Sequence, residues 1–140
     1  MKIRTRGVFM FRGSIVFSVA DSKQKVDLDF GDDIKPTKIV SKGSYVAAGK
    51  TAPYNVWLYR TNFDNDDEFA ALLNRVVALL SEKKSYVREL SKIYEYVRLS
   101  IDVESEYGQV GFSIPPDIVS QIAELGCELE VDIISGGMVE

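Results

Sequence analysis

Two apolar stretches in the first half of the chain, separated by a more polar segment, are predicted to form β-strands. Residues 8–19 are rich in Val, Ile and Phe, and Arg12 with Gly13 in the middle indicates a bend or bulge within one or two strands. Residues 55–60 place apolar side chains on both alternating sides, which predicts a strand with both faces at least partly covered. Between them, residues 21–49 combine an acidic run with proline and glycines, so we expect a loop with one short helical turn or strand.

The middle of the chain changes to the helical period. Apolar residues recur at intervals of three and four over residues 69–80, and the acidic residues 64–68 stand where a helix N-terminus favours a cap and negative charge. A second helix is predicted over residues 85–96. Lys83 and Lys84 mark the expected break, although one continuous bent helix fits the same period.

The last third returns to strands. Residues 99–105 alternate between apolar and polar side chains, and residues 110–114 have strand propensity. Two prolines then start a helix that Gly126 terminates, and residues 129–133 form a closing strand. The apolar side of that strand, which we expect to face inward, consists of Leu129, Val131 and Ile133.

These elements predict a single α+β domain over residues 1–140, with residues 135–140 as a flexible tail. A mostly antiparallel, twisted sheet is expected to pack in a single layer pair against two to three helices, and the chain ends in a β-β-α-β unit. A length of 140 residues and a hydrophobic fraction of 46% are enough for one core without metals or disulfides.

The charge balance argues against a nucleic-acid partner. Asp and Glu number 21 against 17 Lys and Arg, whereas affinity for phosphates comes from basic residues. Lys2, Arg4 and Arg6 form a local exception, which we interpret as a solvated terminus or as the outward side of an edge strand. The apolar stretch that follows is interrupted at residues 12–14, so we expect neither an export signal nor a membrane partner and assign the protein to the cytoplasm.

Several catalytic classes are missing from the composition. The chain has no histidine, the commonest general base and metal ligand, and its single cysteine, Cys127, can form neither an intrachain disulfide nor a Cys-His pair. We interpret Cys127 as a small, buried residue rather than a nucleophile. The composition therefore argues against an enzyme, and no cofactor or metal is expected.

The glycine-rich stretch of Gly108, Gln109 and Gly111 has two interpretations. A phosphate-binding loop needs a helix directly after the glycines, and the nucleic-acid loop of KH domains joins two helices and carries basic residues. Here strands are expected on both sides, and Glu104 and Glu106 precede the glycines. We therefore interpret the stretch as a hairpin turn in which Gly108 supplies a positive φ.

Acidic residues suggest a calcium loop at one place. In the run that begins at Asp27, glycine falls at the fifth position instead of the sixth, and Lys38 stands at the twelfth in place of a glutamate. The spacing fails, so we expect a solvated loop. The aspartates of this run are Asp27, Asp29, Asp32 and Asp33.

Four residues are candidates for a binding site: Trp57, Tyr59, Asp102 and Asp132. The two aromatic residues lie close in sequence to further tyrosines and fit either a contact surface or the core. The two aspartates project from the polar side of two strands, so on neighbouring strands they could share a proton, although ordinary surface charges follow the same pattern.

Several short motifs, taken together, resemble the bacterial family labelled domain of unknown function 4279. They extend from about residue 11 to residue 134, and their order is moderately specific. The resemblance implies a small α+β domain and carries no established activity or catalytic residues. The motifs are Pro36-Thr37-Lys38 with Gly43, the single Trp57, Gly108-Gln109 with Gly111-Phe112, Ala123 to Gly126, and Asp132-Ile133.

The missing catalytic residues and the negative charge predict a non-catalytic protein-interaction domain with one protein partner. Small acidic domains of this kind are sometimes encoded beside secreted toxins as immunity proteins, so an immunity-type role is one form of this prediction. The alternative is a small-ligand-binding protein or a histidine-free enzyme that uses carboxylates. We expect a monomer, or a homodimer formed through an exposed edge strand.

Overall fold

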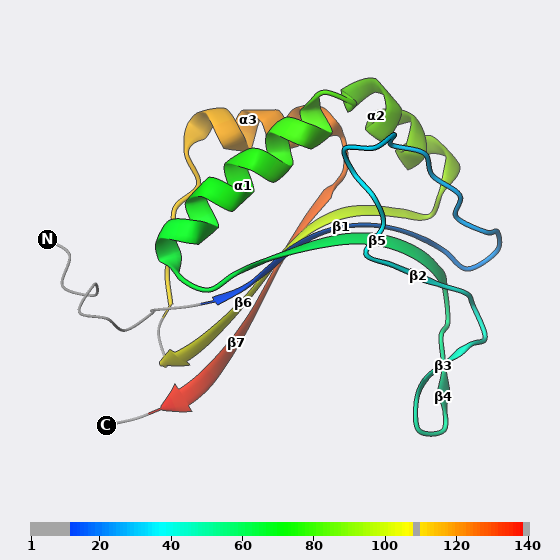
Figure 1. Ribbon diagram of the computed structural model, residues 1–140, viewed down its shortest axis with the longest axis horizontal. Coiled ribbons are helices and arrows are strands. Elements are labelled where there is room, and N and C mark those ends of the chain that lie inside the picture. The colour runs from blue at the N-terminus through cyan, green and yellow to red at the C-terminus, as the bar shows by residue number, and fades with distance from the viewer. Residues whose placement is uncertain (1–11, 108–109, 139–140) are drawn as a thin grey trace, which may run out of the picture.

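Three helices cover one face of a five-stranded sheet, and a small two-stranded sheet extends away from the helices (Figure 1). The computed structural model describes residues 12–107 and 110–138. No helix of the described chain lies against the second face of the large sheet, which is therefore open. The elements are β1 (Arg12–Asp21), β2 (Lys38–Val40), β3 (Tyr45–Ala47), β4 (Lys50–Thr51), β5 (Asn55–Phe63), α1 (Asp66–Ser81), α2 (Lys84–Ile93), β6 (Tyr96–Tyr107), α3 (Pro116–Leu125) and β7 (Glu128–Met138).

The large sheet is mixed, with the strand order β2-β5-β1-β6-β7. β1 pairs antiparallel with both β5 and β6, and β2 pairs antiparallel with β5, whereas β6 and β7 are parallel. A parallel pair needs a crossover connection, and α3 supplies it. These features confirm the predicted α+β class with a mostly antiparallel sheet.

The core lies between the helices and the central strands. Ile15, Phe17 and Val19 of β1 point to the helices and are fully buried, with Leu99 and Ile101 of β6 buried beside them. Burying one such side chain stabilises a fold by about 1.5–3 kcal/mol, so the covered face contributes most of the stability. The helices contribute Leu73, Val76, Val77, Leu80, Val87, Leu90, Ile118, Ile122 and Leu125.

The helix α1 begins where the acidic run predicts. Asn65 Oδ1 accepts a hydrogen bond from the backbone N–H of Glu68 at 3.0 Å, and the Glu68 carboxylate accepts one from the N–H of Asp64 at 2.8 Å. The first bond satisfies an N–H group that the first helical turn leaves free, and the second ties the residue before the cap to the same turn. The expected break between the two helices is also present, because Lys83 separates α1 from α2.

The helix α2 ends earlier than the sequence predicts. It stops at Ile93, because the next residue, Tyr94, is extended with φ −107° and ψ 156°. β6 then begins at Tyr96, which the sequence analysis assigns to the helix. The strand alternation therefore includes residues 96–98 as well as residues 99–105.

Residues 110–114, predicted as a strand, form no strand. Both sides of β6 are paired, with β1 and with β7, so no free edge is available to a strand that turns back beside β6. The apolar side chains of the segment instead pack against the core on the way to α3, and the predicted β-β-α-β end is β-α-β. Gly111 lies exposed in this connection, while Gly108 and Gln109, the centre of the predicted hairpin turn, lie outside the described residues.

The chain around Gly13 has neither the predicted bend nor a bulge. Gly13 lies in register within β1, opposite Phe63 on β5 and Val103 on β6. A Cβ atom at this position would overlap the backbone carbonyl oxygen of Asp102. Glycine is therefore needed because two backbones approach closely.

The segment between β1 and β5 contains an anchored loop and short strands. Phe30 and Ile34 are buried on the helix side of the sheet, and the Phe30 ring centroid lies 5.7 Å from that of Phe17 and 4.9 Å from that of Tyr86. β2, β3 and β4 follow where the sequence predicts mainly loop, and β2 extends the large sheet. The apolar anchors follow neither a helical nor a strand period, so the sequence pattern did not reveal them.

The strand β7 is longer and more exposed than predicted. It runs to Met138, so residues 135–138 continue the strand in place of the predicted tail. Leu129, Val131 and Ile133 are aligned with the buried row of β6 and share its helix-facing side, yet they are 43%, 44% and 49% exposed. The helices stop short of this edge strand, so the predicted inward orientation does not bury these side chains.

Candidate interaction surface

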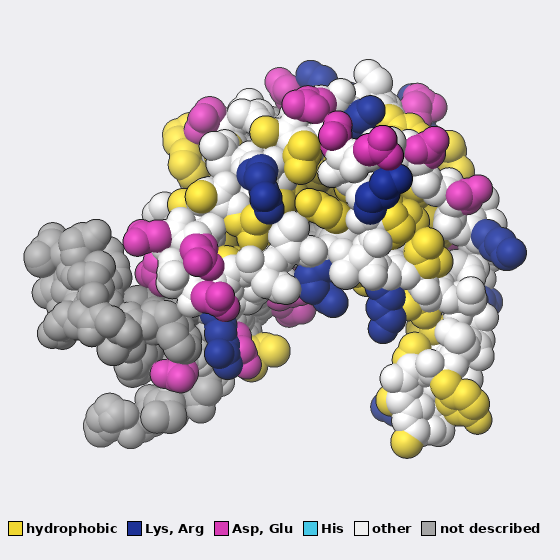
Figure 2. Space-filling model, in the orientation of Figure 1, with side chains coloured by type: hydrophobic (Ala, Val, Ile, Leu, Met, Phe, Trp, Pro, Cys, Tyr) yellow, Lys and Arg dark blue, Asp and Glu magenta, His cyan; other side chains and the backbone are white. Residues whose placement is uncertain are grey.

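The open face of the sheet has a floor of short side chains. Ser14, Val16, Ser18 and Ala20 of β1 point away from the helices, and Val16 is buried whereas the other three are partly exposed. Figure 2 shows the molecule hollowed on this side, next to the hairpin of β3 and β4. Longer polar and aromatic side chains from β6 and β7 stand beside this floor and form the candidate surface.

Two tyrosines and an arginine form one end of this surface. The Tyr54 and Tyr96 rings meet edge to face, with centroids 5.6 Å apart and an angle of 88° between their planes. Arg98 Cζ lies 5.4 Å from the centroid of the Tyr96 ring, within range of a cation–π contact. A hydrogen bond with Tyr96 raises the pKa of Tyr54. Tyr96 nevertheless remains 41% exposed, so its ring is available to a partner.

Arg98 also links β6 to β7. Its Nε donates to Glu128 Oε1 at 2.8 Å, and its Nη1 lies 3.8 Å from Glu130 Oε1. The hydrogen bond to Glu128 is the main cause that raises the pKa of Arg98. Ser100 Oγ donates to the same Glu130 carboxylate at 3.3 Å. These contacts fix the positions of the first carboxylates on β7.

Asp102 and Asp132 lie side by side, as aligned partners on β6 and β7. Partial burial raises the pKa of Asp102, and the neighbouring charges of Asp132 and Glu130 raise it further, while Arg60 has the opposite effect. The native protein therefore holds together carboxylates that repel one another. We call Tyr54, Tyr96, Arg98, Asp102 and Asp132 together the tyrosine–carboxylate face.

The four candidate binding residues do not form one site. Trp57 is buried on the helix side, where its ring centroid lies 5.5 Å from that of Phe30. Tyr59 is aligned with Phe17 and also packs, half-buried, against the core. Only Asp102 and Asp132 lie together on the open face.

Tyr96 and Arg98 are surface residues that were not predicted from the sequence. The signal was present, because these residues and Asp102 stand at even intervals in one strand and must share a face. The strand alternation at Tyr96 was obscured because this residue also fits the end of the helix predicted over residues 85–96. If the alternation begins at Tyr96, the side chains of Tyr96, Arg98 and Asp102 fall on the same face of the strand.

Asp21 is a second residue that the sequence did not single out. It is 2% exposed at the end of β1, and its carboxylate accepts hydrogen bonds from the backbone N–H groups of Lys23, Gln24 and Glu95 at 2.8, 3.1 and 3.0 Å. The bond from Lys23 is the largest cause that lowers the pKa of Asp21. Because Glu95 directly precedes Tyr96, this cluster positions the start of β6 and hence the tyrosine–carboxylate face.

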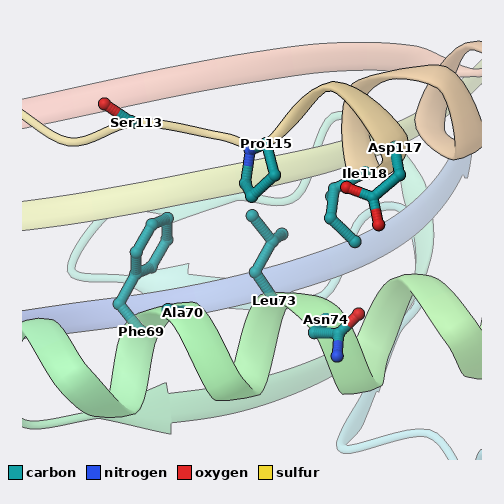
Figure 3. A pocket seen from close by; sticks show the side chains of 8 residues that line it. All are labelled: Phe69, Ala70, Leu73, Asn74, Ser113, Pro115, Asp117 and Ile118. Atoms are coloured by element: carbon teal, nitrogen blue, oxygen red, sulfur yellow. The ribbon is translucent and has the colours of Figure 1, made fainter.

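A groove of about 240 Å³ lies on the other side of the sheet, between α1 and α3 (Figure 3). Its lining includes the apolar side chains of Leu73 and Ile118, and Asp117 is the only titratable residue among the described residues that line it. Neither Asp102 nor Asp132 contributes to it. Among its described lining residues, the groove therefore brings no acid and base together.

Other chemistry is sparse in the described part of the chain. No three His, Cys, Asp or Glu side chains there are placed to hold a metal ion, and the aspartates of residues 27–33 lie exposed. Burial raises the pKa of the Cys127 thiol, which keeps it protonated and weakly nucleophilic at neutral pH. No helix in the same part of the chain combines the length and apolar character that crossing a bilayer requires.

The fold and this surface define a class: a small α+β domain whose mixed sheet is covered by helices on one face and presents a polar, partly aromatic face on the other. Residues 33–136 match the family described as Domain of unknown function (DUF4279), and the chain belongs to this family. The resemblance found in the sequence motifs is thus confirmed. No curated protein and no solved structure matches the chain.

Proposed function

We propose that the chain is a non-catalytic, cytoplasmic protein-interaction domain that binds a partner protein through the tyrosine–carboxylate face. The observation that carries this proposal is the alignment of Asp102 with Asp132 on an accessible surface, where partial burial and then the neighbouring charges of Asp132 and Glu130 raise the pKa of Asp102. Repelling carboxylates lower the stability of the isolated fold. A partner that brings positive charge relieves this repulsion, so binding offsets the loss of stability.

The chemistry of the surface indicates a basic partner. Its carboxylates are suited to lysine or arginine side chains, and electrostatic complementarity sets both specificity and the rate of association. Tyr96, in contact with both Tyr54 and Arg98, adds an exposed aromatic ring of the kind that anchors protein interfaces. An immunity-type role, in which the partner is a toxin with a basic surface, is one specific form of this function.

The experiment is affinity capture from the cells that produce the protein, followed by mapping of the purified complex by hydrogen–deuterium exchange. The wild-type chain and a control with Glu89→Ala and Lys92→Ala, an exposed pair on α2, should recover the same partner. The variants Tyr96→Ala and Asp102→Asn/Asp132→Asn should lose it. Exchange should slow over residues 96–102 and 128–132 in the complex. Equal recovery by all variants, slower exchange on the helix side only, or no partner at all would refute the proposal.

A second function, the binding of a small cationic ligand, is favoured by the alignment of Asp102 with Asp132, because two neighbouring negative charges attract a positive group to the Asp102 carboxylate. The groove between α1 and α3 does not supply that carboxylate, so the ligand would have to bind on the open face. A thermal-shift screen against divalent metals and polyamines tests this function. Stabilisation that disappears in Asp102→Asn would support it, and no stabilisation by any of these compounds would exclude it.

A further inference from the structure

The strand β7 is an exposed edge of the large sheet. Over residues 128–134 it pairs with β6 alone among the described strands, so the backbone N–H and C=O groups on the other side of these residues face no described strand. The strand spans 11 residues and contains neither proline nor lysine, two residues that commonly protect such edges. An edge of this length can accept an additional strand.

The side chains of β7 specify what kind of strand fits. Leu129, Val131 and Ile133 form an exposed apolar row on the helix-facing side. The acidic residues alternate with them and lie on the open side: Glu128, Glu130 and Asp132. A strand that pairs here must therefore present apolar side chains toward the first row and positive charges toward the second, because side chains on neighbouring strands face each other directly.

A second copy of β7 does not meet this requirement. If the apolar rows of two β7 strands were brought together, the acidic rows would also face each other. A two-fold axis at Val131, for example, would set Glu130 opposite the second copy's Asp132. Like charges directly opposite one another destabilise a strand pair.

The chain itself carries a segment with the complementary pattern. Lys2, Arg4 and Arg6 alternate with Ile3 and Thr5, so three positive charges recur with the same two-residue spacing as the three carboxylates of β7. Ile3 and Thr5 are β-branched and favour extended backbone. We propose that residues 2–6 of a second copy add to the free edge of β7, and that two copies exchange these segments reciprocally to form a homodimer.

The same chain cannot easily place its own segment there. Arg12 is aligned with Glu104 of β6, which is aligned with Ile134 of β7, so β1 begins two strands away from the edge. Six residue steps from Arg12 back to Arg6 reach at most about 22 Å. To reach the outer side of Asp132, the N-terminal segment would have to pass round the C-terminal ends of β6 and β7 and return along β7. That path is roughly 45 Å long. A direct path across the open face would lay the apolar residues 8–11 over the carboxylates.

Charge reversal on each side of the proposed contact tests the inference. We would compare the full-length chain with Arg4→Glu/Arg6→Glu and with Glu130→Lys/Asp132→Lys, which leaves the Arg98–Glu128 bond intact. Sedimentation velocity at low salt should show a dimer for the wild-type chain. Each variant alone should have a dissociation constant raised by at least about tenfold.

Mixing the two variants gives the decisive result. In an equimolar mixture the acidic N-terminal segment of one variant faces the basic β7 of the other, and the remaining segment and edge keep their native charges. The mixture should therefore restore the dimer. A control with Asp27→Lys/Asp33→Lys, two exposed aspartates away from β7, should remain dimeric. If Glu130→Lys/Asp132→Lys fails to fold by circular dichroism, the Arg4→Glu/Arg6→Glu variant still decides, since it changes no residue of the described strands.

Three outcomes would overturn the inference: a monomeric wild-type chain at low salt, an unchanged dimer in Arg4→Glu/Arg6→Glu, or two folded variants that do not associate when mixed. High salt should weaken the wild-type dimer, because screening reduces attraction between exposed charges. The inference is independent of the proposed function, since a failure of partner capture would leave the dimer equilibrium unaffected.

Discussion

Replacing Asp102 by asparagine should stabilise the protein at neutral pH. The substitution keeps the size of the side chain and removes one of the carboxylates that repel one another on the open face. The raised pKa of Asp102 indicates that burial and the charges of Asp132 and Glu130 together outweigh the attraction of Arg60. Loss of the charge should therefore remove more repulsion than attraction.

The size of the effect follows from the alignment of Asp102 with Asp132 on adjacent parallel strands. Carboxylates in that relation lie about 5–6 Å apart, because neighbouring strands are separated by roughly 4.8 Å. Two unit charges at this distance repel by roughly 0.7 kcal/mol at the dielectric constant of water and by roughly 3 kcal/mol at an effective value of 20. Since Asp102 is only partly buried, we expect a gain of about 1 kcal/mol in the free energy of unfolding, near the lower figure.

The pH dependence gives the sign of the effect. A raised pKa in the native state means that the native chain holds the Asp102 proton more tightly than the unfolded chain does. The ionised carboxylate is thus unfavourable above the native pKa, and the penalty vanishes below the unfolded pKa. Urea titrations of wild type and Asp102→Asn should show the full gain at pH 7 and almost none at acid pH below the ordinary pKa of an aspartate.

The matched control is Asp33→Asn, an exposed loop aspartate that should change stability by less than about 0.5 kcal/mol. A double-mutant cycle with Asp132→Asn isolates the pair, and the second substitution should gain little once the first is made. A destabilised Asp102→Asn at pH 7, or a gain that is the same at pH 7 and at acid pH, would refute the electrostatic explanation.

Three further substitutions test the fold beneath this surface. Gly13→Ala should lower the free energy of unfolding by about 2–3 kcal/mol in urea titrations, because the new methyl group meets a backbone oxygen of Asp102 that cannot rotate away; an unchanged midpoint would contradict this. Phe30→Ala should lower it by about 3–5 kcal/mol by leaving a cavity beside Trp57, and a smaller loss would mean that the loop collapses onto the gap. Asp21→Asn should lower the melting temperature at pH 7 and reduce the loss of stability in acid, because the native pKa of Asp21 is lowered and its contribution disappears as pH falls through that value; parallel pH profiles for variant and wild type would argue against it.

Local sequence signals predicted the elements whose ends have local causes. The capping residues before α1 and the break at Lys83 depend on side chains and backbone within a few positions. α3 follows the same rule: Pro116 opens the helix, and Gly126 closes it with φ 70°. These features were visible in the sequence because the interactions that produce them are short-range.

The errors arise where the outcome depends on distant parts of the chain. The strand propensity of residues 110–114 was real, but β1 and β7 occupy both sides of β6. Whether a row of apolar residues on β7 is buried depends on how far the helix layer extends, which alternation cannot show. Asp21 is joined to Glu95 by a hydrogen bond across 74 positions, and no local pattern marks such a pair.

The candidate site was predicted only in part, for the same reason. The alternation in β6 and β7 correctly placed Asp102 and Asp132 on the polar side of their strands. Their proximity required the parallel pairing of β6 with β7, which the sequence left open. Trp57, in turn, is buried because Phe30 and the helices cover it, and the loop that carries Phe30 had no recognisable period.

Both surfaces proposed for function arise from the way β7 joins the sheet. The crossover helix α3 packs against α1 and α2 rather than over β7. β7 therefore pairs with β6, but no described helix covers it. Its apolar row therefore stays accessible at the edge, while its acidic row is placed beside Asp102 on the open face. Both proposed contacts, one at the edge of β7 and one on its open face, therefore depend on the position that the parallel pairing with β6 gives this strand.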